Sequence, residues 1–365
     1  MHENNHQKHD SALIVNEGIE QPPIVNPYIS NFYKKNRIKQ LTVKEYVDGI
    51  RSGNTTTLSQ AITLVESNLP EHREIAREIL EECQKHTLES MRIGITGVPG
   101  AGKSTFIEAF GGMVTARGHK LAVLAIDPSS ERSKGSILGD KTRMETLCSD
   151  PNAFIRPSPS GGSLGGVARK TRESIVLCEA AGFDVIFIET VGVGQSETAV
   201  HSMSDFFLLL MLAGAGDELQ GIKRGIMEMS DLIAITKADG SNIDKATMAK
   251  ALYSNALHLF PPSESGWVPT AMTSSAVTKE GLEEILLKIE EYFLMAKGNG
   301  YYLQRRKEQS RYWMYETINE GLKNRFFEDS RITGKLKDFE ERVMEGKLGS
   351  FAAASELLRL YNENR

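Results

Sequence analysis

The segment with the clearest chemistry is a glycine-rich run that ends in lysine and serine. It reads Gly97-Val98-Pro99-Gly100-Ala101-Gly102-Lys103-Ser104, a complete G-x-x-x-x-G-K-S pattern. In such a loop the backbone N–H groups surround phosphate oxygens, the lysine reaches the β- and γ-phosphates, and the serine hydroxyl ligates Mg²⁺. The run follows the apolar residues 91–95 and opens a helical segment at Thr105, which is the setting that the pattern needs. The sequence therefore predicts a nucleotide-binding protein in which Lys103 is catalytic.

Three carboxylates downstream are candidates for the same site. Asp127 ends the apolar run 121–126, where a carboxylate can hold Mg²⁺ directly or through water. Glu189 ends a second apolar run as in a Walker-B element, and Gly192 after it lets backbone amides approach the γ-phosphate. Asp140 lies in a loop rich in glycine and serine that can close over the nucleotide. We expect all three carboxylates to join Ser104 at Mg²⁺, with Glu189 and Asp140 also acting in catalysis.

Recognition of the base is expected from Thr236-Lys237-Ala238-Asp239, at the end of another apolar run. In the N-K-x-D motif of GTPases the aspartate accepts hydrogen bonds from guanine, the lysine stem covers the ring, and the asparagine braces the two loops. Here Thr236 replaces the asparagine, which weakens the signal without removing the preference for guanine. Ser275-Ala276 resembles the second loop that contacts guanine. The predicted ligands are therefore GTP and GDP.

The elements that must position these residues alternate between strand and helix from residue 91 to 297. Candidate strands are Met91–Ile95, Leu121–Ile126, Asp184–Ile188, Phe206–Leu212, Leu232–Thr236 and Val268–Met272. Such alternation predicts an α/β fold with a doubly wound, mainly parallel sheet. Ligands of such sheets bind beyond the carboxyl ends of the strands, where the motifs above are placed.

Two flanking regions are expected to be helical. Before them, residues 1–40 form a polar lead that we expect to be mobile. Its histidines His2, His6 and His9 could bind a metal ion, but we favour the interpretation that they are solvated. Residues 41–90 form a helical extension, broken at Gly53-Asn54 and Pro70. Residues 298–365 carry apolar side chains at helical spacing, which predicts either a helix packed on its own domain or, as we favour, an arm buried against a second subunit. The members of this stripe are Tyr315, Ile318, Leu322 and Phe326.

Composition excludes several other classes. The net charge of −5 disfavours a general binder of nucleic acid or membranes, and no run approaches the roughly 18 apolar residues of a membrane span. Cys83, Cys148 and Cys178 are far apart, so neither a disulfide framework nor a cysteine-rich metal site is indicated. The first 36 residues lack arginine and include acids, unlike a signal or transit peptide. We expect a cytoplasmic protein.

Taken together, the motifs resemble those of the methylmalonyl-CoA mutase-associated GTPases, also labelled MeaB or ArgK, of the G3E group of P-loop GTPases. The resemblance covers residues 41–330 and is most specific in the segment Gly214–Lys223. Besides the phosphate loop, it rests on residues 127–130, 135–140, 164–168 and 189–195.

The resemblance implies a G domain with a C-terminal dimerisation arm. It implies a homodimeric GTPase chaperone that gates delivery of adenosylcobalamin to a cobalamin-dependent acyl-CoA mutase and guards that enzyme against inactivation. Asp127, Asp140 and Glu189 match Mg²⁺ and switch positions of the family, and Gly214–Lys223 matches a third switch that contacts the mutase. The chain departs from the family pattern at Thr236, Ala213 and Ser133-Lys134. The first departure bears on nucleotide selectivity, and the other two bear on the mobility of the switches and hence on coupling to a partner.

Two other function classes share the phosphate loop. A metallochaperone GTPase of the nickel-insertion type would need a Cys/His cluster near the nucleotide, and only the N-terminal histidines support it. A small-molecule kinase would need its own substrate pocket and lid, whereas the glycine-rich loops here are typical of switches. A D-x-H-x-x-G cobalamin motif is absent from the sequence, so the chain is not expected to hold the cofactor as mutases do.

Overall fold

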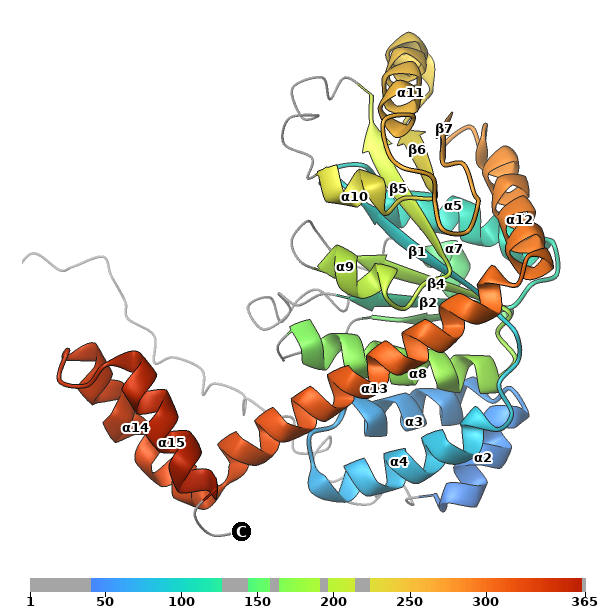
Figure 1. The fold of residues 1–365 in the computed structure, drawn as a ribbon. Coiled ribbons are helices and arrows are strands. Elements are labelled where there is room, and N and C mark those ends of the chain that lie inside the picture. Colours follow the sequence, from blue (N-terminus) through green and yellow to red (C-terminus); the bar gives the residue numbers. More distant parts are fainter. Residues whose placement is uncertain (1–40, 127–143, 158–163, 191–195, 214–223, 363–365) are drawn as a thin grey trace, which may run out of the picture. The chain divides into compact units, whose positions relative to one another are not determined.

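The computed structural model describes residues 41–126, 144–157, 164–190, 196–213 and 224–362 (Figure 1). The predictions for residues 1–40, Asp127, Asp140, Gly192 and Gly214–Lys223 lie outside these ranges. Within the ranges, no helix combines the length and the apolar character that crossing a membrane requires.

A seven-stranded sheet forms the centre of the fold. Its strands are β1 (Met91–Gly97), β2 (Leu121–Ile126), β3 (Ala153–Arg156), β4 (Val185–Thr190), β5 (Phe206–Leu212), β6 (Leu232–Thr236) and β7 (Thr270–Thr273). They lie in the order β3-β2-β4-β1-β5-β6-β7, and every neighbouring pair is parallel. Strands β1, β2, β4, β5 and β6 consist almost entirely of buried residues, as expected for a sheet covered on both faces. The predicted doubly wound α/β fold is confirmed.

The predicted strands match closely, with two exceptions. The last strand begins at Thr270 rather than at Val268, whose side chain is exposed and therefore contributes nothing to the core. Strand β3 was not predicted. It has four residues, of which only Phe154 is buried, so it lacks the apolar run that would mark it in the sequence.

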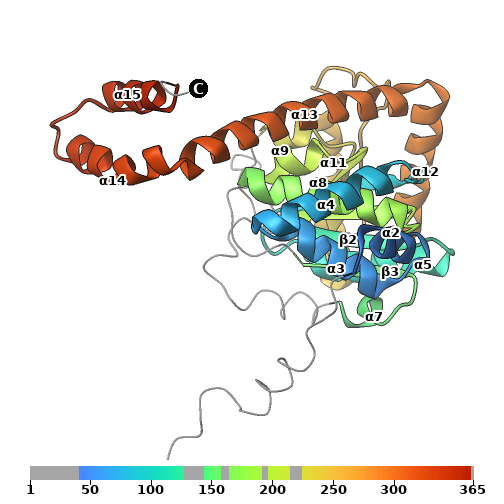
Figure 2. The same cartoon turned by 90° about the horizontal axis from the view of Figure 1, so that it is seen from below.

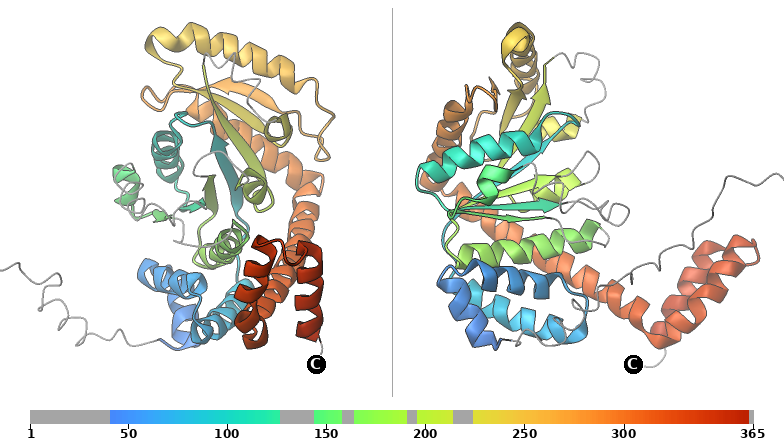
Figure 3. Two further views of the ribbon diagram at one scale, coloured as in Figure 1. Left: turned by 90° about the vertical axis from the view of Figure 1, so that its left-hand side faces the viewer. Right: turned by 180° about the vertical axis from the view of Figure 1, so that it is seen from behind.

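Helices cover both faces of the sheet (Figure 3). One face packs against α5 (Lys103–Ala116), α7 (Glu145–Cys148) and α12 (Leu282–Gly298). The other packs against α8 (Leu164–Ala180), α9 (Ser196–His201), α10 (Arg224–Glu228) and α11 (Ile243–Leu257). Alternate residues of β5 separate the two layers: Leu208 and Leu210 belong to the first core, and Leu209 and Met211 to the second.

Three further helices lie on the outer side of α8 (Figures 1 and 2). They are α2 (Val43–Arg51), α3 (Thr55–Glu66) and α4 (Pro70–Gln84). The Asn54 side chain caps α3 by accepting a hydrogen bond from the N–H of Thr57, and Pro70 occupies the first turn of α4, where its missing N–H is not needed. The predicted breaks at Gly53-Asn54 and Pro70 are thus confirmed.

The chain ends in α13 (Tyr301–Glu328), α14 (Ser330–Met344) and α15 (Ser350–Asn362). The first turns of α13 belong to the main core through Tyr302, whose hydroxyl donates to the Ser90 carbonyl. Further along, Tyr315, Ile318 and Leu322 are about half exposed within this single chain. Helices α14 and α15 have a small core of their own, built on Ile332, Phe339, Ala353 and Leu357.

Candidate nucleotide site

The phosphate loop connects β1 to α5 and depends on glycine at two positions. At Gly97 a Cβ would lie 2.5 Å from the Leu210 carbonyl oxygen, so no larger residue fits where β1 leaves the sheet. Gly102 adopts φ +79° as the N-cap of α5, a left-handed conformation that side chains oppose. The backbone N–H groups of the first helical turn therefore face the loop, which is the arrangement that binds phosphate.

Lys103 is held across the mouth of this loop. Its Nζ donates to the Gly97 carbonyl oxygen at 3.0 Å. Burial lowers the pKa of Lys103, and the carboxylates of Glu189 and Glu197 oppose that shift. The charge of the lysine is thus partly desolvated and placed among acids at the carboxyl end of the sheet, where a bound phosphate would meet it.

The acid partners come from β4 and α9. Glu189 is 5% exposed, and its backbone lies level with Ile95 of β1 and Ala125 of β2. Glu197, in the first turn of α9, is 2% exposed. Glu197 was not predicted from the sequence, because a single acid in a polar run has no distinguishing pattern. Its position after the glycine-rich residues 192–194 is the one signal that could have marked it.

The base loop is joined to the phosphate loop by Thr236. This residue ends β6 and is 4% exposed. Its hydroxyl lies 2.8 Å from the Ala101 carbonyl oxygen and 3.1 Å from that of Met211, so its single proton serves one of them at a time or is shared. Thr236 therefore makes the kind of bridge that the replaced asparagine was expected to make.

The two loops expected to contact the base meet through their side chains. Ser275 donates from its hydroxyl to Asp239 Oδ2, and the same hydroxyl oxygen accepts from the N–H groups of Val277 and Thr278. Lys237 adopts φ +57°, and its Cε lies 3.8 Å from the position of a Cβ on Gly102. The lysine stem therefore runs beside the phosphate loop.

The structure thus brings together the described candidates from three loops. Asp239 presents a carboxylate aligned by Ser275, Lys237 adjoins Gly102, and Thr236 adjoins Ala101. The remaining candidates lie in the phosphate loop and the first turn of α5, apart from Ala276, which follows Ser275 in the loop after β7. Val98, Ser104 and Ala276 are partly buried, whereas Pro99, Gly100 and Thr105 are exposed.

A cluster of metal-binding side chains of the nickel-insertion kind is not found in the described part of the chain. No group of three or more His, Cys, Asp or Glu side chains there has the arrangement to hold a metal ion. Cys83 and Cys178 are buried as free thiols, and burial raises the pKa of both. The described residues give no support to the metallochaperone alternative.

Comparisons with known proteins agree with this geometry. The family profile described as methylmalonyl Co-A mutase-associated GTPase MeaB matches residues 58–331. The chain is 46% identical over 290 residues to GTPase ArgK of Escherichia coli, covering 80% of this chain and 88% of the relative. It is 42% identical over 358 residues to the methylmalonic aciduria type A homolog, mitochondrial, of Mus musculus, covering 91% and 86%.

A solved structure is similar over most of its length. The crystal structure titled LAO/AO transport system kinase superposes with a TM-score of 0.69 at 36% sequence identity, covering 89% of this chain and 99% of the other. Both the breadth of the profile match and the identity to the relatives carry the assignment. The protein is a P-loop GTPase that binds guanine nucleotide, and the chain belongs to the methylmalonyl-CoA mutase-associated GTPase MeaB family.

Proposed function

We propose that this GTPase requires Mg²⁺ and acts as a chaperone of a cobalamin-dependent acyl-CoA mutase of the methylmalonyl-CoA mutase type. In this role it gates delivery of adenosylcobalamin and protects the mutase. The observation that carries the proposal is family membership over residues 58–331, since the family is described by its association with that mutase. A relative named for methylmalonic aciduria supports the same client.

Guanine selectivity is assigned to Asp239 and Lys237. A carboxylate aligned by Ser275 is suited to accept from the two N–H donors on the Watson–Crick edge of guanine, which adenine does not offer. Lys237 would cover the base with its stem. Thr236 would keep the base loop in register with the phosphate loop through Ala101.

The Mg²⁺ site is assigned to Ser104 and Glu189, together with Asp127 and Asp140 outside the described residues. The described donors fit this ion, because hydroxyl and carboxylate oxygens are the ligands that Mg²⁺ prefers, and Glu189 is buried next to Lys103. When bound, Mg²⁺ neutralises charge on the β- and γ-phosphates. Lys103 adds its own positive charge from the loop.

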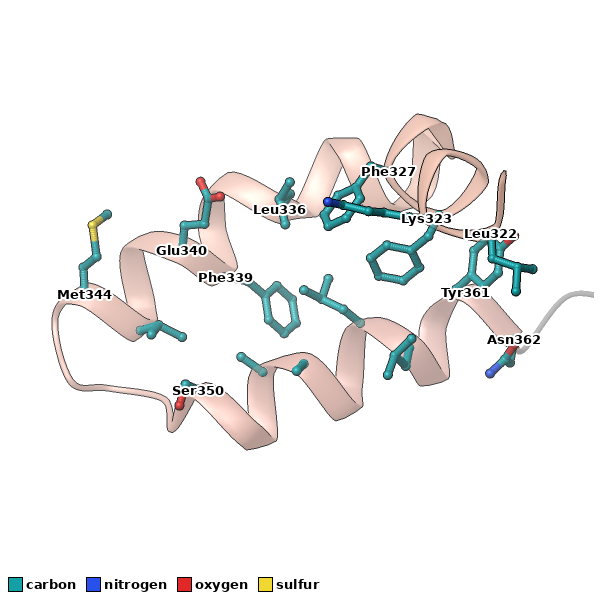
Figure 4. Close-up of a pocket in the computed structure, with 16 residues that line it drawn as sticks. Leu322, Lys323, Phe327, Leu336, Phe339, Glu340, Met344, Ser350, Tyr361 and Asn362 are labelled. Atoms are coloured by element: carbon teal, nitrogen blue, oxygen red, sulfur yellow. The ribbon is translucent and has the colours of Figure 1, made fainter. Parts of the chain in front are cut away.

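A homodimer through the C-terminal helices is proposed from exposed apolar surface. A groove of about 950 Å³ lies among the end of α13, α14 and α15, and Figure 4 shows Phe339 pointing into it between the two shorter helices. The groove begins at Leu322, which continues the exposed stripe of Tyr315 and Ile318. A second copy of this region would bury both surfaces. We accordingly divide the chain into a lead (1–40), a helical extension (41–90), a GTPase domain (91–297) and a dimerisation arm (298–365).

The chaperone proposal is tested by adding a purified methylmalonyl-CoA mutase to the full-length protein and measuring phosphate release. We expect the mutase to co-elute with the protein and to raise its GTPase rate. Lys223→Ala should reduce this stimulation and leave basal hydrolysis and GDP affinity nearly unchanged. The control Lys245→Ala, at an exposed position of α11, should leave the stimulation, the basal hydrolysis and the GDP affinity unchanged. Absence of both co-elution and stimulation would refute the client assignment.

A further inference from the structure

A cleft away from the nucleotide site lies between α4, α8 and α13, which run side by side (Figures 1 and 2). Its volume is about 510 Å³, within the range of small-molecule sites. Arg92, the second residue of β1, lines it, whereas the phosphate loop follows Gly97 at the other end of that strand, about 16 Å away at the usual rise per residue. A ligand in the cleft would therefore not touch the nucleotide.

Three of the four arginines that line the cleft are paired. Arg92 donates to both carboxylate oxygens of Glu179, at 2.8 and 2.9 Å. Arg306 donates to both carboxylate oxygens of Asp205, at 2.6 Å each. Arg169 lies 3.2 Å from Glu173 and 3.1 Å from Glu320, so these two acids are already engaged.

The fourth arginine, Arg172, is different. It is 6% exposed, and among the residues that the structure describes its guanidinium makes no ion pair or hydrogen bond. Its contact is with the ring of Trp313, 5.7 Å from the centroid, a ring that Arg92 also approaches at 5.4 Å. Burial lowers the pKa of Arg172, and the neighbouring acids, Glu173 first, only oppose this shift from a distance. No nitrogen of Arg172 is among the fully buried, unpaired side-chain atoms of the described residues, so the guanidinium faces the cleft, where an anion would accept hydrogen bonds from its donors.

The rest of the lining is mixed. Its polar members are Gln84, Thr87, Glu89, Ser310 and Thr317, of which Glu89 is paired with Lys297 at 2.9 Å. Val176 lies on the same face of α8 as Arg172 and Glu179, and the mouth carries three large side chains that are more than half exposed: Leu88, Leu303 and Met314. Exposed apolar side chains gathered at the rim of a cleft around a buried charge are typical of a site for a ligand with one anionic group and a hydrocarbon portion.

We propose that this cleft binds a small organic anion, with its carboxylate or phosphate group on Arg172 and its apolar portion against Val176 and the rim. Arginine suits this task because its planar guanidinium binds either group through two parallel hydrogen bonds. Trp313 would hold the guanidinium in place from α13, and its own N–H donates to the Ser202 carbonyl oxygen at 3.2 Å, which fixes the ring.

The test is thermal unfolding of the full-length protein saturated with GDP and Mg²⁺, so that the phosphate loop is occupied. The probes are hexanoate, hexyl phosphate and the neutral hexanol at matched ionic strength. We expect at least one of the two anions to raise the unfolding midpoint by roughly 3–5 °C at about 100 times its Kd, and hexanol to have little effect. A response to hexanoate alone identifies a carboxylate ligand, and one to hexyl phosphate alone a phosphate ester.

Two variants make the assignment specific. Arg172→Met removes the charge at similar volume, so its midpoint without probe should equal or exceed that of the natural protein, and the response to the anion should vanish. Val176→Phe keeps Arg172 but fills the cleft, so at least ten times more of the anion should be needed to produce the same shift of the unfolding midpoint. Arg77→Met, at an exposed arginine of α4, serves as the matched control and should respond normally. No midpoint shift with either anion, an equal shift with hexanol, or a full response in both cleft variants would overturn the proposal.

Discussion

The bridge from Thr236 to the phosphate loop allows a quantitative prediction. Replacing Thr236 with valine keeps the shape of the side chain and removes the hydroxyl, which leaves the Ala101 carbonyl without its donor at 2.8 Å. Ala101 is 1% exposed, so water reaches this carbonyl only if the loops separate. A buried acceptor that loses its partner costs about 1–3 kcal/mol.

Most of this cost should appear in nucleotide affinity. We expect the two loops of the nucleotide-free variant to separate and admit water to the Ala101 carbonyl, whereas a bound nucleotide would contact both loops and hold them together. We therefore expect Thr236→Val to weaken GDP binding by 1–2 kcal/mol, roughly 5- to 30-fold, and to change the unfolding free energy of the nucleotide-free protein by less than about 0.5 kcal/mol. Isothermal titration calorimetry measures the first quantity and urea unfolding the second.

Two matched substitutions control this experiment. Thr236→Ser keeps the hydroxyl and should restore most of the affinity. Thr247→Val removes a hydroxyl that donates to the Ile243 carbonyl on the exposed side of α11, and it should leave GDP binding unchanged. If Thr236→Val binds GDP within twofold of the natural protein, the hydroxyl does not brace the site and the reasoning from the Ala101 contact is wrong.

Four other outcomes are expected. Lys103→Ala should lose at least ~10²-fold in kcat/KM for GTP, measured by phosphate release, and unchanged hydrolysis would remove the phosphate loop from catalysis. The natural protein should bind GDP more tightly than ADP in calorimetry, and Asp239→Asn should largely abolish the difference, because hydrogen bonds to a charged group contribute roughly 1.5–3 kcal/mol. The double variant Ile318→Asp/Leu322→Asp should be monomeric by light scattering where the natural chain is dimeric, since both side chains are about half exposed in one chain; a monomeric natural chain at micromolar concentration would contradict the proposed arm. Burial lowers the pKa of His201 to about 3, and Arg305 donates a hydrogen bond to its Nε2, so the folded protein holds this histidine neutral. In the unfolded chain the histidine takes up a proton below its ordinary pKa of 6.5, so the free energy of unfolding should fall by up to about 2 kcal/mol from pH 7 to pH 5. Urea titrations measure this loss, and His201→Gln should remove the part that His201 causes.

The structure changes how the arm can be tested. Cutting the chain after Gly300 would remove Tyr302 from the core and leave the buried carboxylates of Asp205 and Glu179 without Arg306. A nucleotide-binding monomer is therefore not expected from that truncation. Point substitutions on the exposed stripe avoid this loss because they leave the first turns of α13 in place.

Local features were predictable because their causes are local. The phosphate loop is one continuous backbone segment whose glycines and helix start determine its shape, so Gly97–Ser104 could be assigned without knowing what surrounds it. The central strands are buried on both faces and therefore appear as continuous apolar runs, as in Phe206–Leu212. Strand β3 escaped prediction because only one of its four residues, Phe154, is buried, so the strand carries no such apolar run.

By itself, the sequence determined the nucleotide class, the fold class and the helical character of residues 41–90 and 298–365. These features depend on residues that are close together in the chain. Only the tertiary structure decided which distant residues meet. Thr236 bonds Ala101 across 135 residues, and Asp239 meets Ser275 across 36. The tertiary structure also placed Arg172 in its cleft without an acceptor among the described residues, while three nearby arginines are paired with acids. Such pairings depend on how strands and helices are placed against one another, and residue order alone does not contain that placement.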